Sequence, residues 1–344
     1  MPKLINTEQF FTKAADYPVL DIRSPAEYEK GHIPGAINFP LLSNEERKQV
    51  GTTYKQIGKN EAVLQGLDII GPKMSFFAKE ALELAKDNQL ILYCWRGGMR
   101  SNSMAWLLEK VGIKVFVLKN GYKAYRHFCK QQLSQSVDII IVSGSTGSGK
   151  THILKALHNA GEQIIDLEGI ANHKGSVFGA MGQLKQLSNE QFENQLYLEW
   201  SRLDRTRTIW LEDESNAIGC NYIPKELFVQ MRCAPVVRVI IDDEVRVERL
   251  LHEYAVFDKT LLIDNINKIK KRLSPEKAKE AIDAVNRDNL AISIRIVLGY
   301  YDKAYNFGLG KRNPATITEI NLGRLSIEKC ARNLILNKEK IKGE

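Results

Sequence analysis

Short apolar runs that end in polar residues alternate with helical patterns through residues 1–130. Such runs predict strands, whereas apolar residues spaced three or four apart predict helices. Strands that alternate with helices favour a mainly parallel sheet, and ligands bind beyond the carboxyl ends of its strands. The expected elements are strands at Pro18–Arg23, Leu90–Tyr93 and Val115–Leu118, a turn with a short strand at Gly31–Pro40, and helices at Met74–Asp87 and Ser101–Val111.

A polar stretch around Gln131–Ser136 has the composition of a linker, and a second α/β pattern begins at Val137. From about Glu244 onward the pattern is mostly helical. We therefore expect an α/β protein with domains at 1–134 and 135–243, followed by a helical region at 244–344. The second pattern predicts strands at Ile139–Val142, Gln163–Asp166, Thr208–Asp213 and Val236–Asp242, a helix at Thr151–Ala160 and a late strand at Thr316–Ile320.

The composition is that of a globular chain with sizeable cores, because 44% of the 344 residues are hydrophobic. No apolar run reaches the roughly 18–20 residues of a membrane span. Polar residues interrupt the N-terminus by Glu8, where a signal peptide would stay apolar. We therefore expect a soluble, cytoplasmic protein. The five cysteines lack CxxC spacing, which argues against a disulfide scaffold or a zinc site.

Positive charge is concentrated in the last third of the chain. The net charge is +8, and residues 244–344 hold 20 Lys and Arg against 14 Asp and Glu. A basic surface suits a polyanion such as RNA, although a solvated helix face explains the same charges equally well. The candidate RNA-binding residues are Lys268, Lys270, Lys271 and Arg272.

Cys94 follows the strand Leu90–Tyr93 and begins a loop with the spacing C-x5-R. The amides of the five intervening residues can surround a tetrahedral oxyanion, and Arg100 can bond two of its oxygens. A thiol near arginines and a helix N-terminus, which we expect Ser101 to cap, loses its proton easily and becomes a nucleophile. The alternative is a buried, inert cysteine. The candidate catalytic residues are Cys94, Arg96, Gly97, Gly98 and Arg100.

The segment Gly144–Thr151 matches G-x-x-x-x-G-K-[ST] after a predicted strand and before a predicted helix. In this motif backbone N–H groups hold phosphates, the lysine neutralises them and the last hydroxyl reaches Mg²⁺. The match predicts diphosphate binding and leaves nucleotide hydrolysis open. The candidate phosphate-binding residues are Gly144, Thr146, Gly147, Ser148, Gly149, Lys150 and Thr151.

Polar segments after two neighbouring strands offer further candidates for acid–base chemistry or for Mg²⁺. A carboxylate is expected at the end of a strand beside the phosphate loop, and Glu212, Asp213 and Asp166 all follow predicted strands. Simple capping or surface charge explains such acids as well. His173 lies in a glycine-containing loop, where a base or phosphate contact and a structural role are equally compatible with the sequence.

The Cys94 loop belongs to a wider pattern that resembles a rhodanese (sulfurtransferase) domain. The pattern includes Asp21–Ser24, Glu27–Tyr28, Gly31–Ala36 and Gly121–Tyr122. In that family a persulfide forms on the cysteine of a loop that usually has six residues. Here seven residues run from Cys94 to Arg100, which resembles the phosphatase branch of the same fold. The wider loop favours a substrate bulkier than thiosulfate.

The two domains together, with the strings DLEGIANHKGSVFG (residues 166–179) and EDESNAIG (residues 212–219), closely resemble the tRNA 2-selenouridine synthases over nearly the whole chain. That resemblance implies an enzyme acting on wobble 2-thiouridine in certain tRNAs. Geranyl diphosphate would supply a geranyl group to the sulfur, and selenophosphate would then supply the selenium that replaces it. Cys94 corresponds to the cysteine held responsible for selenation, and we expect the phosphate loop to hold the diphosphate of the geranyl donor.

Two other interpretations stay open on the sequence. A phosphatase–kinase fusion would also use the C-x5-R loop and the phosphate loop, although Tyr93 stands where cysteine phosphatases commonly carry His. An RNA-binding module with a degenerate rhodanese domain would use neither of these loops for catalysis. A tRNA partner would bring anticodon bases that stack on aromatic side chains. The candidate stacking residues are Trp95, Tyr222, Tyr254, Tyr300 and Tyr301.

Overall fold

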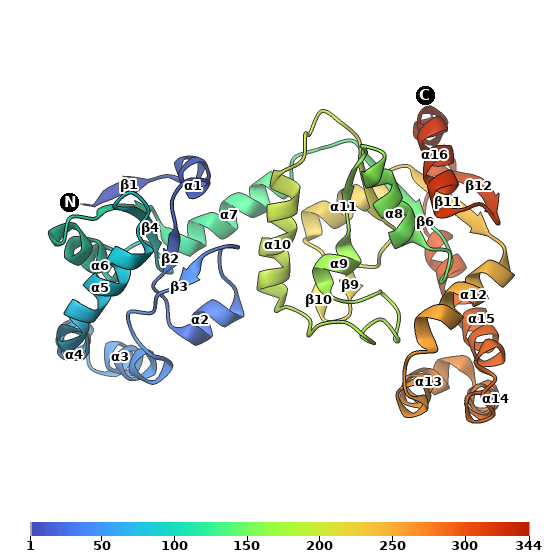
Figure 1. The fold of residues 1–344 in the computed structure, drawn as a ribbon, viewed down its shortest axis with the longest axis horizontal. Coiled ribbons are helices and arrows are strands. Elements are labelled where there is room, and N and C mark those ends of the chain that lie inside the picture. The colour runs from blue at the N-terminus through green and yellow to red at the C-terminus, as the bar shows by residue number, and fades with distance from the viewer. Residues whose placement is uncertain (1, 344) are drawn as a thin grey trace. The chain divides into compact units, whose positions relative to one another are not determined.

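The computed structural model describes residues 2–343 and divides the chain into two compact units, residues 1–132 and 133–344 (Figure 1). Each unit contains its own parallel sheet. Helix α7 (Gly121–Leu133) extends into the predicted linker because Leu133 is a buried side chain at its end. The expected α/β class is thus confirmed, and the boundaries expected at residues 134 and 243 stay predictions.

Unit 1 is built on a five-stranded sheet in the order β1-β5-β4-β2-β3, and all of its pairs are parallel. The strand before the cysteine loop, β4, is buried on both faces over Leu90–Tyr93, as expected for a sheet covered by helices. The strands are β1 (Lys3–Ile5), β2 (Val19–Asp21), β3 (Ile37–Asn38), β4 (Gln89–Tyr93) and β5 (Lys114–Leu118).

The helices of unit 1 cover this sheet with apolar side chains. Phe77 and Ala81 of α5 and Met104 and Leu108 of α6 belong to one buried cluster with the strands. The N-terminal strand β1 and helices α1, α3 and α4 were not predicted from the apolar pattern. The helices are α1 (Thr7–Ala14), α2 (Pro25–Lys30), α3 (Asn44–Gln56), α4 (Lys59–Ile70), α5 (Met74–Leu84), α6 (Met99–Lys110) and α7, with a 3-10 turn at Gly71–Lys73.

Unit 2 contains a second five-stranded parallel sheet, in the order β12-β11-β6-β8-β7. The strand that leads into the phosphate loop, β6, is central, and β8 lies directly beside it. This order brings the segments after β6, β7 and β8 to one edge of the sheet. The strands are β6 (Ile139–Ser143), β7 (Gln163–Ile165), β8 (Ile209–Glu212), β11 (Val236–Ile241) and β12 (Ile317–Gly323), with a hairpin of β9 (Ala217–Ile218) and β10 (Asn221–Tyr222).

The late strand expected at Thr316–Ile320 is present as β12, and it pairs with β11 over six residues of each strand. The C-terminal region therefore adds a strand to the sheet as well as helices. Within the described residues, no helix is long and apolar enough to cross a membrane. The helices of unit 2 are α8 (Lys150–Asn159), α9 (Leu167–Ala171), α10 (Asn189–Ser201), α11 (Lys225–Cys233), α12 (Asp243–Tyr254), α13 (Lys259–Leu273), α14 (Pro275–Asn286), α15 (Leu290–Leu309), α16 (Ile327–Leu336) and α17 (Lys338–Lys342).

Helices α12 to α15 pack against one another beside the sheet of unit 2, with α13 and α14 farthest from it (Figure 1). Their apolar faces form two buried clusters. Ile266 and Val285 belong to the first cluster, and Leu250 and Ile294 belong to the second. These helices begin immediately after β11, so they lie close to the phosphate loop that follows β6.

Candidate functional site

The cysteine loop leaves β4 at Cys94 and ends where α6 begins at Met99. Gly98 occupies the N-cap, so the expectation that Ser101 caps this helix is wrong. Ser101 lies one turn inside, where its side chain is buried. Because α6 begins at Met99 and not at Ser101, its N-terminal amides and their partial positive charge lie closer to the thiol than we expected from the sequence.

The thiol of Cys94 is buried, with 3% of the residue exposed, among apolar side chains and hydrogen-bond donors. Burial raises the pKa of Cys94, but the Ser101 hydroxyl, the Arg100 charge and the amides of Arg96 and Gly98 outweigh it and lower that pKa. The Ser101 hydroxyl has no other hydrogen-bond partner within residues 2–343 and is therefore available to the sulfur. The loop thus favours a thiolate, the nucleophilic form of cysteine.

Gly97 allows the loop to lie directly against the segment after β5. Its φ is +58°, and a side chain at this position would place a Cβ 2.5 Å from the carbonyl oxygen of Leu118 and 2.9 Å from the amide of Asn120. Only glycine combines that backbone angle with so close an approach. Gly98, in contrast, has open space around it. Its structural role is that of the N-cap residue of α6.

The two arginines of the loop differ in exposure. Arg96 is exposed, whereas Arg100 is half-buried and its Nη1 donates to Oε2 of Glu27 at 2.9 Å. Burial raises the pKa of Glu27, but Arg100 and the Ser24 amide lower it overall. Glu27 therefore stays ionised and holds the arginine at the loop. The sequence contained Glu27 only as part of a family pattern, without this role.

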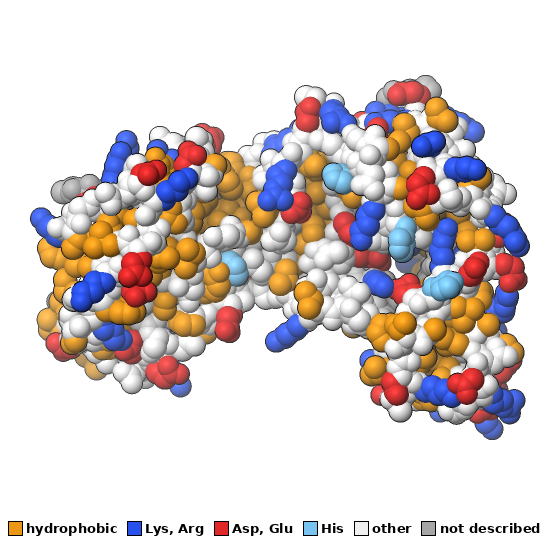
Figure 2. Space-filling model, viewed as in Figure 1, with side chains coloured by type: hydrophobic (Ala, Val, Ile, Leu, Met, Phe, Trp, Pro, Cys, Tyr) orange, Lys and Arg blue, Asp and Glu red, His pale blue; other side chains and the backbone are white. Residues whose placement is uncertain are grey.

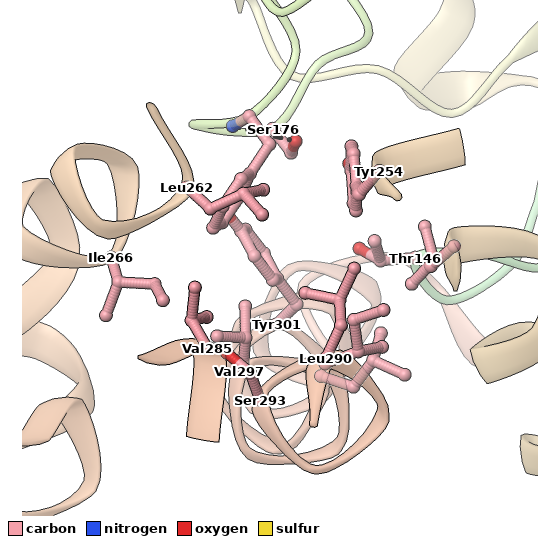
Figure 3. A pocket seen from close by; sticks show the side chains of 14 residues that line it. Thr146, Ser176, Tyr254, Leu262, Ile266, Val285, Leu290, Ser293, Val297 and Tyr301 are labelled. Atoms are coloured by element: carbon pink, nitrogen blue, oxygen red, sulfur yellow. Dashed lines mark hydrogen bonds between the residues drawn. The ribbon is translucent and has the colours of Figure 1, made fainter. Parts of the chain in front are cut away.

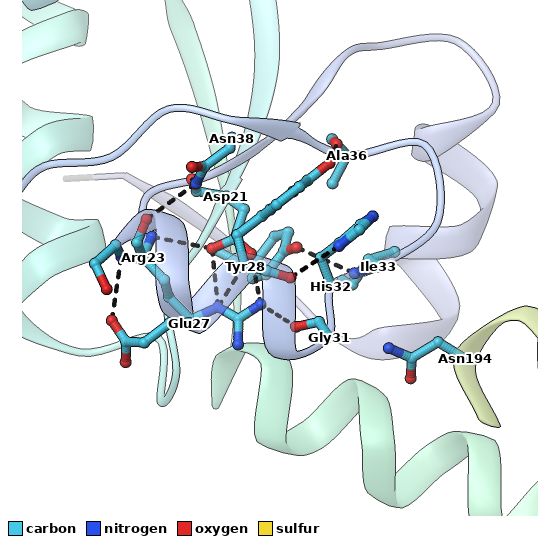
Figure 4. Close-up of polar contacts among 12 residues, drawn as sticks. Asp21, Arg23, Glu27, Tyr28, Gly31, His32, Ile33, Ala36, Asn38 and Asn194 are labelled. Carbon is cyan, nitrogen blue, oxygen red and sulfur yellow. Dashed lines mark hydrogen bonds and ion pairs between the residues drawn. The ribbon is translucent and has the colours of Figure 1, made fainter. Parts of the chain in front are cut away.

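The first part of the rhodanese-like pattern forms a buried polar network in unit 1 (Figure 4). Arg23 and Asp21 are almost completely buried, and their side chains approach to 2.6 Å. Arg23 also donates to the carbonyl oxygen of Gly31 at 2.7 Å, and its guanidinium lies 4.0 Å from the ring centroid of Tyr122. A buried pair of this kind is sustained only when its remaining donors are satisfied. The network therefore fixes the chain around the cysteine loop.

The phosphate loop has the geometry expected of its motif. It follows β6, and α8 begins at Lys150 with Gly149 as N-cap at a φ of +81°. The Lys150 Nζ donates to the carbonyl oxygen of Gly144 at 3.0 Å, so the side chain folds back over the loop. The buried Ser148 hydroxyl has no partner in the described chain. The loop thus offers free donors at the start of a helix, as an anion site requires.

Three glutamates surround the lysine and threonine of this loop. Thr151 donates to Oε2 of Glu168 at 2.9 Å, and the charges of Glu214, Glu168 and Glu212 raise the pKa of Lys150 against the opposing effect of burial. Burial, together with repulsion from Asp166 and Glu253, raises the pKa of Glu168. Burial and repulsion from Glu168 raise the pKa of Glu214 to about 8 and raise that of Glu212 well above its ordinary value. A site with this much carboxylate favours a cation or a proton beside the phosphate.

The sequence predicted only Glu212 of these three. Glu168 follows β7 and Glu214 follows β8, and both strands end at the same edge as β6. The strings that contain them pointed to functional loops, but the convergence of their side chains on Lys150 depends on the strand order. Residue spacing alone does not give that order.

The other acid–base candidates have partners of their own. Asp166 caps α9 by accepting from the Gly169 amide at 2.7 Å. Asp213 forms an ion pair with buried Arg312 at 2.5 Å and accepts from the Ser143 hydroxyl, also at 2.5 Å. The structure thus places Glu212, rather than Asp166 or Asp213, beside Thr151.

His173 is a buried side chain whose Nδ1 lacks a hydrogen-bond partner in the described part of the chain. Burial lowers its pKa, so the ring is neutral at physiological pH. A Cβ added to Gly179 would lie 2.9 Å from the ring, which shows that the ring packs against its own loop.

A cation site at Thr151 agrees with the residues present. Within residues 2–343, no three His, Cys, Asp or Glu side chains are grouped closely enough to hold a metal. Mg²⁺ in phosphate sites, however, takes only one or two protein carboxylates and completes its shell with phosphate oxygens and water. Glu212 Oε1 is buried without a partner in that part of the chain, and Thr151 is its neighbour. These two residues fit Mg²⁺ bound together with a diphosphate.

Helix α12 adds two arginines to the phosphate loop that the sequence analysis missed. Arg246 Nε donates to the carbonyl oxygen of Thr146 at 2.9 Å, and Arg249 Nη1 donates to that of Ser148 at 2.5 Å. Arg246 is buried and also pairs with Asp302 of α15 at 2.5 Å. The signal was their spacing of three residues on the helix after β11, which turns both side chains to one face.

The basic cluster forms the exposed C-terminal part of α13. Lys268, Lys270, Lys271 and Arg272 are all exposed, while Ile266, Ile269 and Leu273 are buried. Figure 2 shows Lys and Arg side chains with acidic ones between them on the part of the molecule that contains α13 and α14. The positions of the four residues are compatible with a polyanion partner and with a solvated helix face.

Comparisons with known proteins agree with this architecture. The family model described as the tRNA 2-selenouridine synthase AAA domain matches residues 137–322, and the rhodanese-like domain model matches residues 7–128. A tRNA 2-selenouridine synthase from Psychromonas ingrahamii is 36% identical over 256 residues, which is 73% of this chain and 67% of the relative. Another from Pseudomonas syringae pv. tomato is 39% identical over 250 residues, covering 70% and 66%.

The chain spans about two thirds of the length of these curated relatives. A crystal structure of the N-terminal domain of a protein from Clostridium difficile 630 is 42% identical and covers 37% of this chain and 98% of that one, with a TM-score of 0.34. The family model that matches residues 137–322 covers more than half of the chain. The resemblance stated from the sequence is therefore confirmed, and the chain belongs to the tRNA 2-selenouridine synthase family.

Proposed function

We propose that this protein converts 2-thiouridine at the wobble position of tRNA to 2-selenouridine in two transfer steps. One observation carries the proposal. A single chain holds a cysteine loop between β4 and α6, where Arg100 lies in the first turn of α6, and a phosphate loop between β6 and α8, where Lys150 folds back over the loop. The first site suits a tetrahedral selenophosphate, and the second suits the diphosphate of an activated alkyl donor.

The first step takes place at the phosphate loop. The sulfur of 2-thiouridine forms a bond to C1 of geranyl diphosphate, the C–O bond breaks, and pyrophosphate leaves with the bonding electrons. The base loses its N3 proton to solvent, so the geranylated product is neutral. Lys150, the unpartnered Ser148 hydroxyl and the amides at the start of α8 stabilise the negative charge that builds up on the leaving group. Mg²⁺, held by Thr151 and Glu212 when bound, supplies further charge neutralisation for the diphosphate.

The second step takes place at the cysteine loop. The selenium of selenophosphate forms a bond to C2 of the base, and the C–S bond breaks so that the geranyl thiolate leaves. Water then cleaves the P–Se bond, which releases phosphate and leaves 2-selenouridine. The amides after Cys94 and the side chain of Arg100 hold the phosphoryl oxygens, which is why the seven-residue loop suits this donor. We assign Cys94 to this step and not to geranylation.

The basic C-terminal region would bind the tRNA backbone in both steps. Lys268, Lys270, Lys271 and Arg272 are exposed and available to phosphates. Contacts of this kind supply affinity without sequence information. Recognition of the anticodon base itself would then come from the sites that carry out the chemistry.

The two assignments are tested by mass spectrometry of tRNA nucleosides after incubation with geranyl diphosphate and then with selenophosphate. Lys150→Ala should abolish geranylation, and Cys94→Ser should leave geranylation intact but stop selenium incorporation. Cys220→Ser, at an exposed cysteine, is the matched control and should behave as the unchanged protein. Full geranylation by the Lys150 variant or selenouridine from the Cys94 variant would refute the corresponding role, and hydrolysis of p-nitrophenyl phosphate would favour a phosphatase.

A further inference from the structure

An apolar pocket lies among helices α12 to α15 of unit 2 (Figure 3). Eight of its 14 lining residues are Leu, Ile or Val, and three are aromatic. Its cavity volume is about 30 Å³, and about 410 Å³ when the open space at its mouth is included. The pocket is therefore a narrow slot, and a hydrocarbon chain that enters it must push the lining side chains apart.

The slot is a gap between the two hydrophobic clusters of the helical region. Leu262 and Val297 of its lining belong to one cluster, and Leu250 and Leu298 belong to the other. Cores normally pack without such gaps. A gap that remains between two well-formed clusters is a feature of the arrangement of α12, α13 and α15 and not of one missing side chain.

The slot reaches the phosphate loop. Thr146 of that loop is one of the lining residues and lies at the opposite side of the slot from Ile266 in Figure 3. A Cβ at the neighbouring Gly147 would lie 3.1 Å from a methyl carbon of Leu250, another lining residue. The phosphate loop and the apolar slot are thus parts of one continuous surface.

The loop over residues 174–179 closes another side of the slot. Phe178 packs on Tyr254, with ring centroids 5.5 Å apart, and the Tyr301 hydroxyl accepts a hydrogen bond from the Val177 amide at 3.1 Å. Glu168, which accepts from Thr151, belongs to the same sequence string as Phe178. One segment of chain therefore contributes both to the phosphate site and to the slot.

The chemistry of the lining selects an apolar ligand. The tyrosine hydroxyls are engaged within the protein, Tyr301 with Val177 and Tyr254 with Ser176. A cavity lined by aliphatic carbon without free polar partners stays dry and accepts hydrocarbon. Because it joins the site of a diphosphate, the matching ligand has a diphosphate at one end and a hydrocarbon chain at the other.

We infer that this slot binds the hydrocarbon chain of the prenyl diphosphate whose diphosphate lies on the phosphate loop. The inference rests on the proposed use of an alkyl diphosphate donor and locates its apolar part. The slot then selects the donor by chain length, while the phosphate loop supplies an anchor common to all diphosphates.

The test compares two neighbouring leucines of α13. Leu262 lines the slot, whereas Leu261 is 49% exposed and does not. Affinities for inorganic pyrophosphate, dimethylallyl diphosphate and geranyl diphosphate are measured by calorimetry on the full chain. The unchanged protein should bind geranyl diphosphate at least about tenfold more tightly than pyrophosphate, because burial of the chain adds hydrophobic free energy. Leu262→Phe should lose most of this gain and retain pyrophosphate affinity, and Leu261→Phe should change nothing.

Val297→Leu adds a single methylene to the slot. If Leu262→Phe does not fold, this smaller change tests whether the slot binds the hydrocarbon chain. The inference is wrong if folded slot variants keep the chain-length preference of the unchanged protein, or if that protein binds pyrophosphate and geranyl diphosphate equally. Failure of the proposed function has a different signature. Chain-dependent binding that is lost in the slot variants, without any geranyl group on tRNA, would leave the slot assignment standing and refute the reaction.

Discussion

At the scale of single residues, the properties of Cys94 come from donors contributed by its own loop and helix. Burial alone would raise its pKa, and the structure overcomes burial with the Ser101 hydroxyl, the Arg100 charge and two amides. Each donor favours the thiolate over the thiol. Removal of one donor should therefore shift the pKa upward without altering the fold of the loop.

We predict that Ser101→Ala raises the pKa of Cys94. The thiolate fraction at a given pH should fall, because the native protein stabilises the charged form with this hydroxyl. Thiolate absorbance near 240 nm, measured against pH and corrected with Cys94→Ser, reports the titration. Ser103→Ala, at an exposed serine of α6, should leave the midpoint where it is. If Ser101→Ala left the titration midpoint of Cys94 unchanged, the Ser101 hydroxyl would not contribute to the stability of the thiolate.

Candidate sites made of contiguous residues could be predicted from the sequence, whereas contacts between distant segments of the chain could not. The Cys94 loop and the phosphate loop were found because each lies within eight residues of chain between a strand and a helix. Glu27 lies 73 positions from Arg100, and its contact was not foreseen. Asp213 was considered as a magnesium ligand because nothing in the sequence brings Arg312 to it.

At the scale of elements, α12 connects the phosphate loop to the helical region. Arg246 spans from the Thr146 carbonyl to Asp302 of α15, and Arg249 reaches the Ser148 carbonyl. The loop therefore keeps its shape partly through a helix that lies 100 residues later in the chain. The helical pattern after Glu244 was predicted, but its packing on the loop depends on β11 lying next to β6.

We predict that Arg246→Ala destabilises unit 2 by about 2 kcal/mol. Removal of Arg246 leaves Asp302 without its ion-pair partner, and this lowers the free energy of unfolding by more than the intact pair contributes to it. The expected loss is smaller than for a fully enclosed pair because Asp302 is 31% exposed. Urea unfolding measures the change. The pair of Arg295 with Glu244 has the same 2.5 Å separation but is exposed, so Arg295→Ala should hardly alter stability. Equal effects of the two variants would contradict this view.

Pyrophosphate affinity gives a second measurement on the same variants. Arg246→Ala should weaken pyrophosphate binding because the Thr146 carbonyl loses its donor and the loop loses its shape. Arg295→Ala should bind pyrophosphate like the unchanged protein. An Arg246 variant that is less stable but binds normally would show that α12 supports the fold and not the geometry of the loop.

At the scale of the whole molecule, each unit contains one of the two proposed anion sites, and the excess of positive charge lies mostly in the last third. A tRNA substrate must be held by contacts that do not depend on which step is in progress. Charge-based contacts to phosphates meet this need because they tolerate changes at the base. The exposed residues at the end of α13 are the candidates for that role, and their contribution is measurable through its dependence on salt.

We predict that replacing Lys270, Lys271 and Arg272 by Glu weakens tRNA binding and makes it less sensitive to salt. Each lost phosphate contact should reduce the slope of log K against log[salt] by about 0.7–0.9, so the slope should become shallower by roughly 2–3. Fluorescence anisotropy of labelled tRNA at several salt concentrations measures it. The same charge change at Lys48, Lys55 and Lys59, exposed on α3 and α4, is the control. Equal loss in both triple variants would mean that overall charge, and not the α13 cluster, attracts the tRNA, whereas loss confined to the α13 variant locates the contact.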